Sequence, residues 1–206
     1  VVRRRVRELA AAGMQKLSIS ADPYHQQFVP IACARRAARV AGEVLGEARV
    51  QVRWRAWLGK GFDTAELSPV DRDACFARAA ASQPRDRLNG RAAETLARHL
   101  PLQPPEHFAD IPCRDALLRS KHVHIAPGGG VMPGTCAGLL LGRIDRSGVS
   151  ALWRSLHGPL SDRPILRALC DRGPMGLWDA ARAAGFVPES GYASKCHLCW
   201  SLRKHL

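Results

Sequence analysis

The stretch Gln15-Lys-Leu-Ser-Ile-Ser-Ala-Asp-Pro23 begins with alternating apolar and polar residues and ends on a chain breaker. Leu17 and Ile19 alternate with polar neighbours, which is typical of a strand that buries one face. Residues 48–58 repeat this alternation and predict a second strand, and an alanine-rich helix is expected over residues 31–45 between them. A strand, a helix and a strand joined by short turns predict a β-α-β unit with parallel strands and a right-handed crossover.

Helical patterns flank this unit on both sides. Apolar residues near the start of the chain recur at helical spacing until Gly13, and Val1 lies inside that pattern, so we expect the chain to be part of a longer protein. Ser68-Pro-Val-Asp71 is similar to a capping box and predicts a helix through about Ala81. Asn89-Gly-Arg-Ala-Ala-Glu94 opens another predicted helix, which runs to Leu100. Residues 1–100 therefore predict consecutive β/α units.

The composition changes at Pro101-Leu-Gln-Pro-Pro105, which reads as a stiff linker before a second region, residues 101–206. Residues 121–125 and 131–132 predict two strands of a hairpin around the turn Pro127-Gly-Gly-Gly130. That glycine run is not expected to hold a nucleotide, because no helix follows it. Short helices are predicted at about 149–156, 164–170, 175–184 and 195–205.

The overall composition limits the classes of function. The hydrophobic content of 46% is enough for a core, and no apolar run approaches the roughly 20 residues that span a bilayer. We expect a soluble, cytoplasmic protein without a membrane partner. Lysine and arginine exceed aspartate and glutamate by 31 − 18 = 13, but the excess is spread along the chain without a long basic run. Nucleic-acid binding is therefore not expected.

Seven cysteines, an odd number, appear without a signal peptide, which favours metal or thiol chemistry over a disulfide framework. Cys196 and Cys199 form a Cys-x-x-Cys pair at the predicted start of a helix, where thiolate is favoured. A redox pair would instead follow a strand near the start of a fold, so half of a tetrahedral metal site is the better interpretation. Cys113 and Cys136 flank the hairpin and are expected to complete the site.

Four thiolates suit either zinc or an iron–sulfur cluster, and their spacing does not decide between the two. The alternative is that Cys113 and Cys136 are buried small residues without a ligand role. Core packing is the expected role of the three remaining cysteines, Cys33, Cys75 and Cys170.

Two further groups of residues are candidates for function. Asp22 and His25 lie in a loop that joins a strand to a helix, where α/β barrels place active-site residues, although a turn capped by Asp22 explains them equally well. His122 and His124 are predicted to share one face of their strand, which we expect to be half-exposed.

Taken in order, four segments resemble the radical S-adenosylmethionine (radical SAM) family, in particular members with a cysteine-rich C-terminal extension of the SPASM or twitch type. The segments span nearly the whole chain and are Leu17-Ser-Ile-Ser-Ala-Asp-Pro-Tyr-His-Gln-Gln-Phe28, Gly90-Arg-Ala-Ala-Glu94, His122-Val-His-Ile-Ala-Pro-Gly-Gly-Gly-Val-Met-Pro-Gly-Thr-Cys-Ala-Gly138 and Gly191-Tyr-Ala-Ser-Lys-Cys-His-Leu-Cys199.

The resemblance implies an α/β fold in which residues 1–100 form the C-terminal half of an incomplete (β/α) partial TIM-type barrel. Residues 101–206 would form a small cysteine-rich extension of a hairpin plus helices. By the same resemblance, the residues expected to lie at the S-adenosylmethionine site are Ser18, Ser20, Asp22 and, near its carboxylate, Arg53 or Arg55. The residues expected to hold an auxiliary [4Fe–4S] cluster are Cys113, Cys136, Cys196 and Cys199.

The sequence departs from the family in two places. The family-defining Cys-x-x-x-Cys-x-x-Cys occurs nowhere in it. The family also usually has an acidic turn that contains one glycine, where this sequence has Ala126-Pro-Gly-Gly-Gly130. The resemblance implies that the longer protein is a radical SAM enzyme acting on a peptide or small molecule. Because the three-cysteine motif is absent here, we expect this chain alone to be inactive. The alternative is a non-enzymatic module with a structural Cys₄ zinc site.

Overall fold

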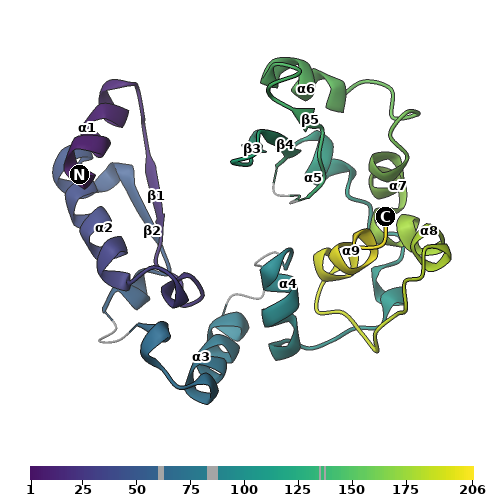
Figure 1. Ribbon diagram of the computed structural model, residues 1–206, viewed down its shortest axis with the longest axis horizontal. Helices are drawn as coiled ribbons and strands as arrows, with labels where there is room; N and C mark the ends of the chain where they lie inside the picture. Colours follow the sequence, from purple (N-terminus) through teal and green to yellow (C-terminus); the bar gives the residue numbers. More distant parts are fainter. Residues whose placement is uncertain (60–62, 83–87, 135, 137) are drawn as a thin grey trace. The chain divides into compact units, whose positions relative to one another are not determined.

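The computed structural model describes residues 1–59, 63–82, 88–134, 136 and 138–206. The chain divides into two compact units (Figure 1), unit 1 over Val1–Ser82 and unit 2 over Gln83–Leu206. No helix among the described residues is both long enough and apolar enough to cross a membrane.

Unit 1 is built on the predicted β-α-β arrangement. Strand β1 (Leu17–Ser20) pairs in parallel with β2 (Val50–Arg53), and α2 (Ile31–Leu45) connects them. Helix α1 (Val2–Ala11) packs against α2. The prediction of a parallel β-α-β unit is therefore confirmed, although two strands are all that the described part of unit 1 contributes to its sheet.

One core of unit 1 lies between helices α1 and α2 and one face of the sheet. Its buried residues are Val6, Ala41, Leu45 and Val50, with Leu17, Ile19 and Val52 packed against them. The alternation seen in the sequence therefore places the apolar side chains of both strands on the helix side. The polar side chains face away from that core.

The predicted strand over residues 48–58 is too long. The strand ends at Arg53 because Trp54 adopts a left-handed backbone conformation with φ of 61°. In that position the Trp54 ring packs edge-on against Tyr24, with the ring centroids 5.9 Å apart. A 3₁₀ helix over Arg55–Gly59 follows in place of the expected strand.

Helix α3 (Pro69–Ser82) starts at the predicted capping box. The Asp71 backbone N–H donates to Ser68 Oγ at 3.1 Å, and that hydroxyl donates to the Asp71 carboxylate at 2.7 Å. The first bond satisfies a backbone N–H that a helix start would otherwise leave unpaired, and the second holds the Ser68 hydroxyl in position.

Unit 2 is a set of short helices around a small antiparallel sheet. The sheet contains β3 (Val123–Ile125), β4 (Gly130–Pro133) and β5 (Gly142–Arg143) in that order. The hairpin of β3 and β4 is confirmed, whereas β5 was not predicted. The helices are α4 (Arg91–Leu96), α5 (Arg114–Leu118), α6 (Val149–Leu156), α7 (Pro164–Arg172), α8 (Trp178–Ala183) and α9 (Lys195–Arg203).

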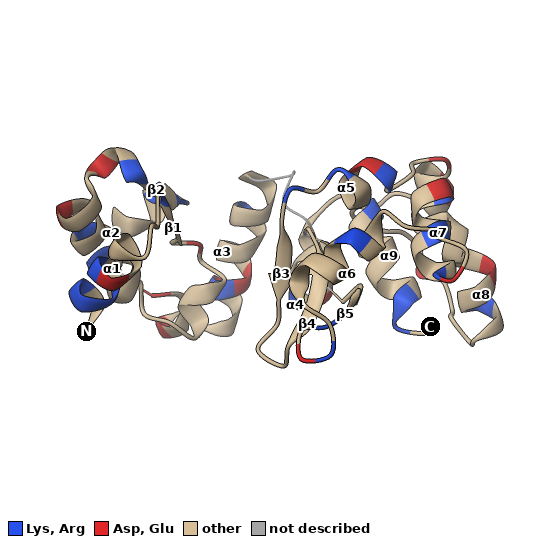
Figure 2. Ribbon diagram, turned by 90° about the horizontal axis from the view of Figure 1, so that it is seen from above, with Lys and Arg blue, Asp and Glu red and all other residues tan. Residues whose placement is uncertain are grey.

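One core joins the parts of unit 2. Tyr192, Leu198 and Leu202 are fully buried in it, together with Leu117 of α5 and Leu156 of α6. Helix α9 therefore lies at the centre of the unit's packing. Figure 2 shows that lysine and arginine are distributed over both units with acidic residues between them.

The boundary between the units falls before residue 83 rather than after residue 100. Glu94 of α4 forms an ion pair with Lys204 at 2.7 Å, which ties α4 to the end of the chain. Gln103, within the expected linker, exchanges two backbone hydrogen bonds with Tyr192 at 2.8 and 2.9 Å. The proline-rich stretch therefore belongs to unit 2.

Candidate functional site

The exposed face of the two-stranded sheet in unit 1 carries polar residues predicted from the sequence. Ser18 pairs with Gln51 and Ser20 pairs with Arg53 in the parallel register, and all four are exposed. Because paired residues of a sheet point to the same side, the structure brings Ser18, Ser20 and Arg53 onto one face. Arg55 is exposed on the 3₁₀ helix that follows β2, outside this alternation.

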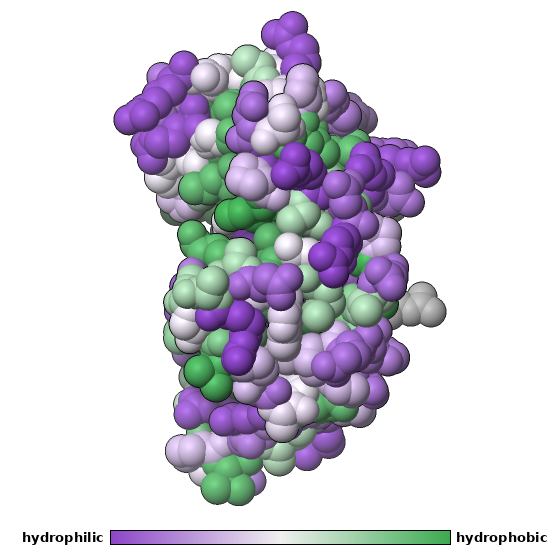
Figure 3. Space-filling view, turned by 90° about the vertical axis from the view of Figure 1, so that its right-hand side faces the viewer, coloured by the Kyte–Doolittle hydropathy of each residue, from purple (hydrophilic) through white to green (hydrophobic). Residues whose placement is uncertain are grey.

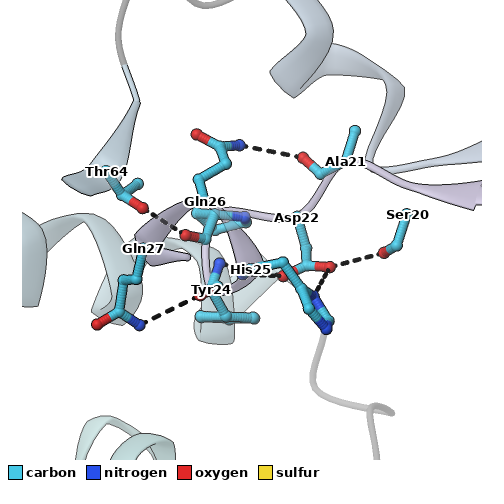
Figure 4. A network of polar contacts seen from close by, with 9 residues as sticks. Ser20, Ala21, Asp22, Tyr24, His25, Gln26, Gln27 and Thr64 are labelled. Carbon is cyan, nitrogen blue, oxygen red and sulfur yellow. Dashed lines mark hydrogen bonds and ion pairs between the residues drawn. The ribbon is translucent and has the colours of Figure 1, made fainter. Parts of the chain in front are cut away.

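Asp22 is the centre of a hydrogen-bond network at the end of β1 (Figure 4). Its Oδ1 accepts the backbone N–H groups of Tyr24 at 3.0 Å and His25 at 2.9 Å. Its Oδ2 accepts the Ser20 hydroxyl at 2.6 Å and lies 2.6 Å from Nδ1 of His25. Asp22 thus caps the turn, as one of the two interpretations predicted, and it also orients the His25 ring. The functional interpretation of Asp22 and His25 stays a prediction.

The environment of Asp22 favours its charged form. Burial acts to raise the pKa of this carboxyl, but the hydrogen bonds from Ser20 and from the backbone and side chain of His25 outweigh it, and the pKa is lowered. The Asp22 residue is only 4% exposed, whereas the His25 side chain is 73% exposed. The loop therefore holds an exposed imidazole in contact with a buried, ionised carboxylate.

Two contacts hold the backbone of this loop. The Thr64 hydroxyl donates to the Pro23 carbonyl at 2.6 Å, and the Gln26 amide donates to the Ala21 carbonyl at 3.2 Å. Tyr24 packs between the rings of Trp54 and Phe76, at centroid distances of 5.9 and 5.1 Å. The loop is consequently fixed by Trp54, which follows β2, by Phe76 of α3 and by the segment around Thr64.

In unit 2, Cys196 and Cys199 lie in the first turns of α9, as predicted. The Ser194 hydroxyl caps this helix by accepting the His197 backbone N–H at 3.1 Å. The cap fixes the direction in which the chain enters α9 and thereby positions the Cys-x-x-Cys pair.

Cys113 lies close to this pair although it is distant in the sequence. Lys195 Nζ donates to the Pro112 carbonyl at 3.3 Å, which places the residues preceding Cys196 and Cys113 in contact. Cys113 and Cys199 also pack against the same core of unit 2. The structure therefore brings the segment that carries Cys113 to the start of α9, where the Cys-x-x-Cys pair lies.

Cys136 follows β4 and reaches the same helix through its neighbours. Its backbone N–H donates to the Pro133 carbonyl at 3.1 Å. A Cβ placed on Gly138 would lie 3.3 Å from Nη1 of Arg203 and 3.6 Å from the Trp200 ring, so this segment runs along α9. Cys136 also packs against the same core as Cys113 and Cys199.

The Cys199 thiol is protonated at neutral pH. Burial raises its pKa to about 11, Arg203 opposes this shift, and Cys113 and Cys196 add to it. The expected preference for thiolate at a helix start is therefore wrong for Cys199, because desolvation exceeds the effect of the helix N-terminus. A buried, protonated thiol is a poor nucleophile, which argues against a redox role.

Among the described residues, no group of three or more histidine, cysteine, aspartate or glutamate side chains is arranged to hold a metal ion. All seven cysteines lie among those residues, and none of them is in a disulfide. The donor atoms that a soft metal or an iron–sulfur cluster requires are thus near one another, but their side chains are not in a coordinating arrangement.

The remaining cysteines divide in an unexpected way. Cys75 and Cys170 are buried, as predicted, but Cys33 is exposed, and its predicted core role is wrong. The buried stripe of α2 passes through Ile31, Val40 and Ala41, and Cys33 lies on the opposite side of the first turn.

Cys170 is a neighbour of the thiol cluster that the sequence did not reveal. The Cys113 backbone N–H donates to the Leu169 carbonyl at 2.8 Å, directly beside Cys170. Cys113 also contributes to the pKa of the Cys170 thiol. Burial raises the pKa of Cys170, and the charge of Cys113 raises it further. The sequence signal at Cys170 is that of an ordinary apolar helix face, so only the tertiary contact with residue 113 identifies it.

The hairpin residues follow their predicted arrangement. The rings of His122 and His124 lie on one side with their centroids 5.1 Å apart, and both residues are exposed. Gly129 has a positive φ of 80° in the turn between β3 and β4, so the glycine run joins two strands as expected.

Comparison with known proteins gives no further guidance. No family model, no curated protein and no solved structure matches this chain.

Proposed function

We propose that unit 2 holds an iron–sulfur cluster through the thiolates of Cys113, Cys136, Cys196 and Cys199. The observation that carries this proposal is the contact between Lys195, which precedes Cys196, and Pro112, which precedes Cys113. Cys113, Cys136 and Cys199 also pack against one core. Iron–sulfur clusters are held by cysteine thiolates, and four thiolates are the usual complement for a [4Fe–4S] cluster.

The surroundings of these thiols suit a negatively charged thiolate site. Arg203 hydrogen-bonds to Cys199, and its charge acts to lower the pKa of that thiol. Lys195 precedes Cys196 and contacts the segment that carries Cys113. Binding would replace thiol protons by metal, and it would require the side chains to turn toward a common centre.

We extend this proposal to a longer radical SAM protein in which unit 1 contributes to the S-adenosylmethionine site. The exposed hydroxyls of Ser18 and Ser20 and the Arg53 guanidinium share one face that ends at ionised Asp22. Hydroxyls and carboxylates suit the ribose and the ammonium group of this cofactor, and an arginine suits its carboxylate. When bound to a three-cysteine cluster, the cofactor supplies a radical for chemistry on a peptide or small molecule.

The test of the cluster is anaerobic reconstitution of the chain with iron and sulfide. We expect broad brown absorbance and bound sulfide in the wild type, and their loss in Cys196→Ser. Cys33→Ser is the matched control, since Cys33 is exposed on α2 in unit 1, and it should keep the wild-type content. Equal iron and sulfide in the two variants would overturn the proposal.

Metal analysis of the purified protein separates the cluster from the second candidate function, a structural zinc module. The clustered thiols around Cys199 would serve zinc equally well, because zinc also prefers thiolate ligands. Stoichiometric zinc that depends on Cys196, without bound sulfide after reconstitution, would support the zinc module and refute the iron–sulfur proposal.

The unit 1 extension is tested by equilibrium dialysis of S-adenosylmethionine against the chain. We expect weak saturable binding that falls in Arg53→Gln and persists in Arg36→Gln, because Arg36 is exposed on α2 rather than on the sheet face. Equal binding by the two variants would remove Arg53 from the site.

A further inference from the structure

Unit 2 contains a cavity of about 690 Å³ that the proposed cluster does not use. It lies between α7, α9 and the segment that follows Cys136. Its apolar walls include Leu139, Leu140, Leu141, Ile165, Leu166 and Trp200. A cavity of this size with mainly apolar walls is typical of small-molecule sites in proteins. Figure 3 shows hydrophobic residues exposed among hydrophilic ones on one face of the protein.

Three cationic side chains also line this cavity, and they are Arg163, Arg203 and Lys204. Among the described residues that line it, no aspartate or glutamate is present. Lys204 is paired with Glu94, which lies outside the lining, so part of its charge is already balanced. Leu206, the last residue of this chain, also lines the cavity and brings its terminal carboxylate. Arg163 and Arg203 outweigh this single negative charge, so the balance of charge at the cavity is positive.

Arg163 is held in place at the cavity rather than extended into solvent. Its guanidinium donates to Ser155 Oγ at 2.9 Å and to the Leu141 carbonyl at 3.4 Å. Because both acceptors are neutral, the positive charge of Arg163 is not neutralised by these bonds, and its orientation is fixed in advance. A fixed cation beside an apolar wall recognises an anion at low entropic cost.

A second cationic edge lies on α9. The Arg203 guanidinium carbon is 5.9 Å and Lys204 Nζ is 5.7 Å from the centre of the Trp200 ring. Trp200 thus provides an apolar surface with two cations beside it. The cavity offers apolar burial at its walls and positive charge from Arg163, directly before α7, and from the end of α9.

We propose that this cavity binds an amphipathic anion, which is a molecule with an apolar chain or ring and a carboxylate or phosphate group. The apolar part would lie against the leucines, Ile165 and Trp200, and the anionic group would lie at Arg163. None of the four predicted cysteine ligands lines the cavity. Arg203 is the side chain that the two sites share, because it lines the cavity and also hydrogen-bonds to Cys199, whereas Arg163 belongs to the cavity alone.

The probe for this site is decanoate, and its binding to the whole chain is measured by isothermal titration calorimetry. Decyltrimethylammonium carries a chain of the same length with the opposite charge, and acetate carries the anion without the chain. We expect saturable decanoate binding that is at least tenfold tighter than the binding of either comparison compound. Equal affinity for the cationic compound would overturn the proposal, because a purely apolar cavity would explain it.

Two variants locate the site, and one serves as a control. Arg163→Gln should weaken decanoate binding about tenfold, whereas Arg167→Gln, one turn further along α7 and outside the lining, should bind as the wild type does. Ile165→Trp should abolish binding by filling the cavity while keeping all three cations. Wild-type affinity in Ile165→Trp, or the absence of saturable decanoate binding in the wild type, would refute the proposal.

Iron and sulfide content after reconstitution is measured in the same variants. We expect it to be unchanged in Arg163→Gln, so that a failure of the anion site and a failure of the cluster give different results.

Discussion

A largely desolvated thiol is a costly place for a negative charge, and partly buried Cys199, packed against the core of unit 2, occupies such a place at the start of α9. Its pKa of about 11 lies above the ordinary value of 9.0 because burial disfavours the thiolate. A group with a raised pKa stabilises the folded state fully at pH values below its unfolded pKa, and this contribution is lost as the pH rises through the folded pKa. For Cys199 that window runs from about pH 9 to about pH 11.

We therefore expect the metal-free protein to lose stability between pH 9 and pH 11, by about 2 kcal/mol from Cys199 alone. Urea denaturation at pH 8.5 and pH 10.5 measures this loss. Cys199→Ala should show a smaller decrease than the wild type, and Cys33→Ala should match the wild type because its thiol is exposed. Identical decreases in the two variants would show that other groups cause the alkaline destabilisation.

The same residue connects stability to metal binding. Since Cys199 is protonated at neutral pH, each bound metal or cluster must displace its proton, and apparent affinity should rise with pH. Asp22 is the opposite case, because its hydrogen bonds lower its pKa and its contribution is lost only as the pH falls below the ordinary value of 3.8. The two candidate sites therefore lose their native charge states at opposite ends of the pH scale.

Secondary elements with strong local patterns could be predicted from the sequence. Helix α2 begins after a proline and ends before Gly46, whose φ of 85° favours glycine, so its bounds follow from local chemistry. The hairpin of β3 and β4 likewise follows from two apolar segments around a glycine turn. The end of β2 could not be predicted in this way. The left-handed conformation of Trp54 accompanies a contact with Tyr24, which is distant in the sequence.

The thiol site was also predictable only in part from local sequence patterns. The helical position of Cys196 and Cys199 follows from the pattern around them, and the flanking of the hairpin by Cys113 and Cys136 follows from their sequence positions. The proximity of Cys170 to Cys113 depends on how α7 packs beside the segment before α5, which no local pattern reports. Similarly, β5 has only two residues, too few for a periodic signal.

The cap of α9 gives a prediction at this scale. Ser194→Ala removes the hydroxyl that accepts the His197 N–H and should destabilise unit 2 by about 1 kcal/mol. Because α9 carries two of the proposed ligands, the variant should also bind iron and sulfide less tightly. Ser150→Ala, at an exposed position within α6, is the control and should change neither quantity. Wild-type stability in Ser194→Ala, measured by urea denaturation, would contradict this role of the cap.

At the scale of the whole chain, the composition change at Pro101 suggested a boundary that the fold does not follow. Proline enrichment indicates a locally stiff backbone, but it does not indicate which part of the protein that backbone packs against. Gln103 pairs with Tyr192, and Glu94 pairs with Lys204, so residues on both sides of Pro101 contact the last segment of the chain. Long-range contacts of this kind could not be read from composition.

Two fragments test this boundary. A fragment of residues 83–206 should fold cooperatively and keep the metal content of the full chain, since it contains the whole core around α9 and all four proposed ligands. A fragment of residues 101–206 lacks α4, whose Leu96 is buried and whose Glu94 pairs with Lys204. We expect it to be less stable by about 2–4 kcal/mol, because losing a buried leucine-sized contact typically costs that much.

Thermal denaturation and iron and sulfide content distinguish the outcomes. If α4 belongs to unit 2, the longer fragment melts as a single transition and the shorter one melts earlier with lower cluster occupancy at the same iron concentration. Equal melting temperatures would show that α4 adds nothing to unit 2 and would return the boundary to residue 100. Because both fragments contain Cys113, Cys136, Cys196 and Cys199, a difference in occupancy between them would measure how far the packing of α9, rather than the presence of the ligands, holds the site together.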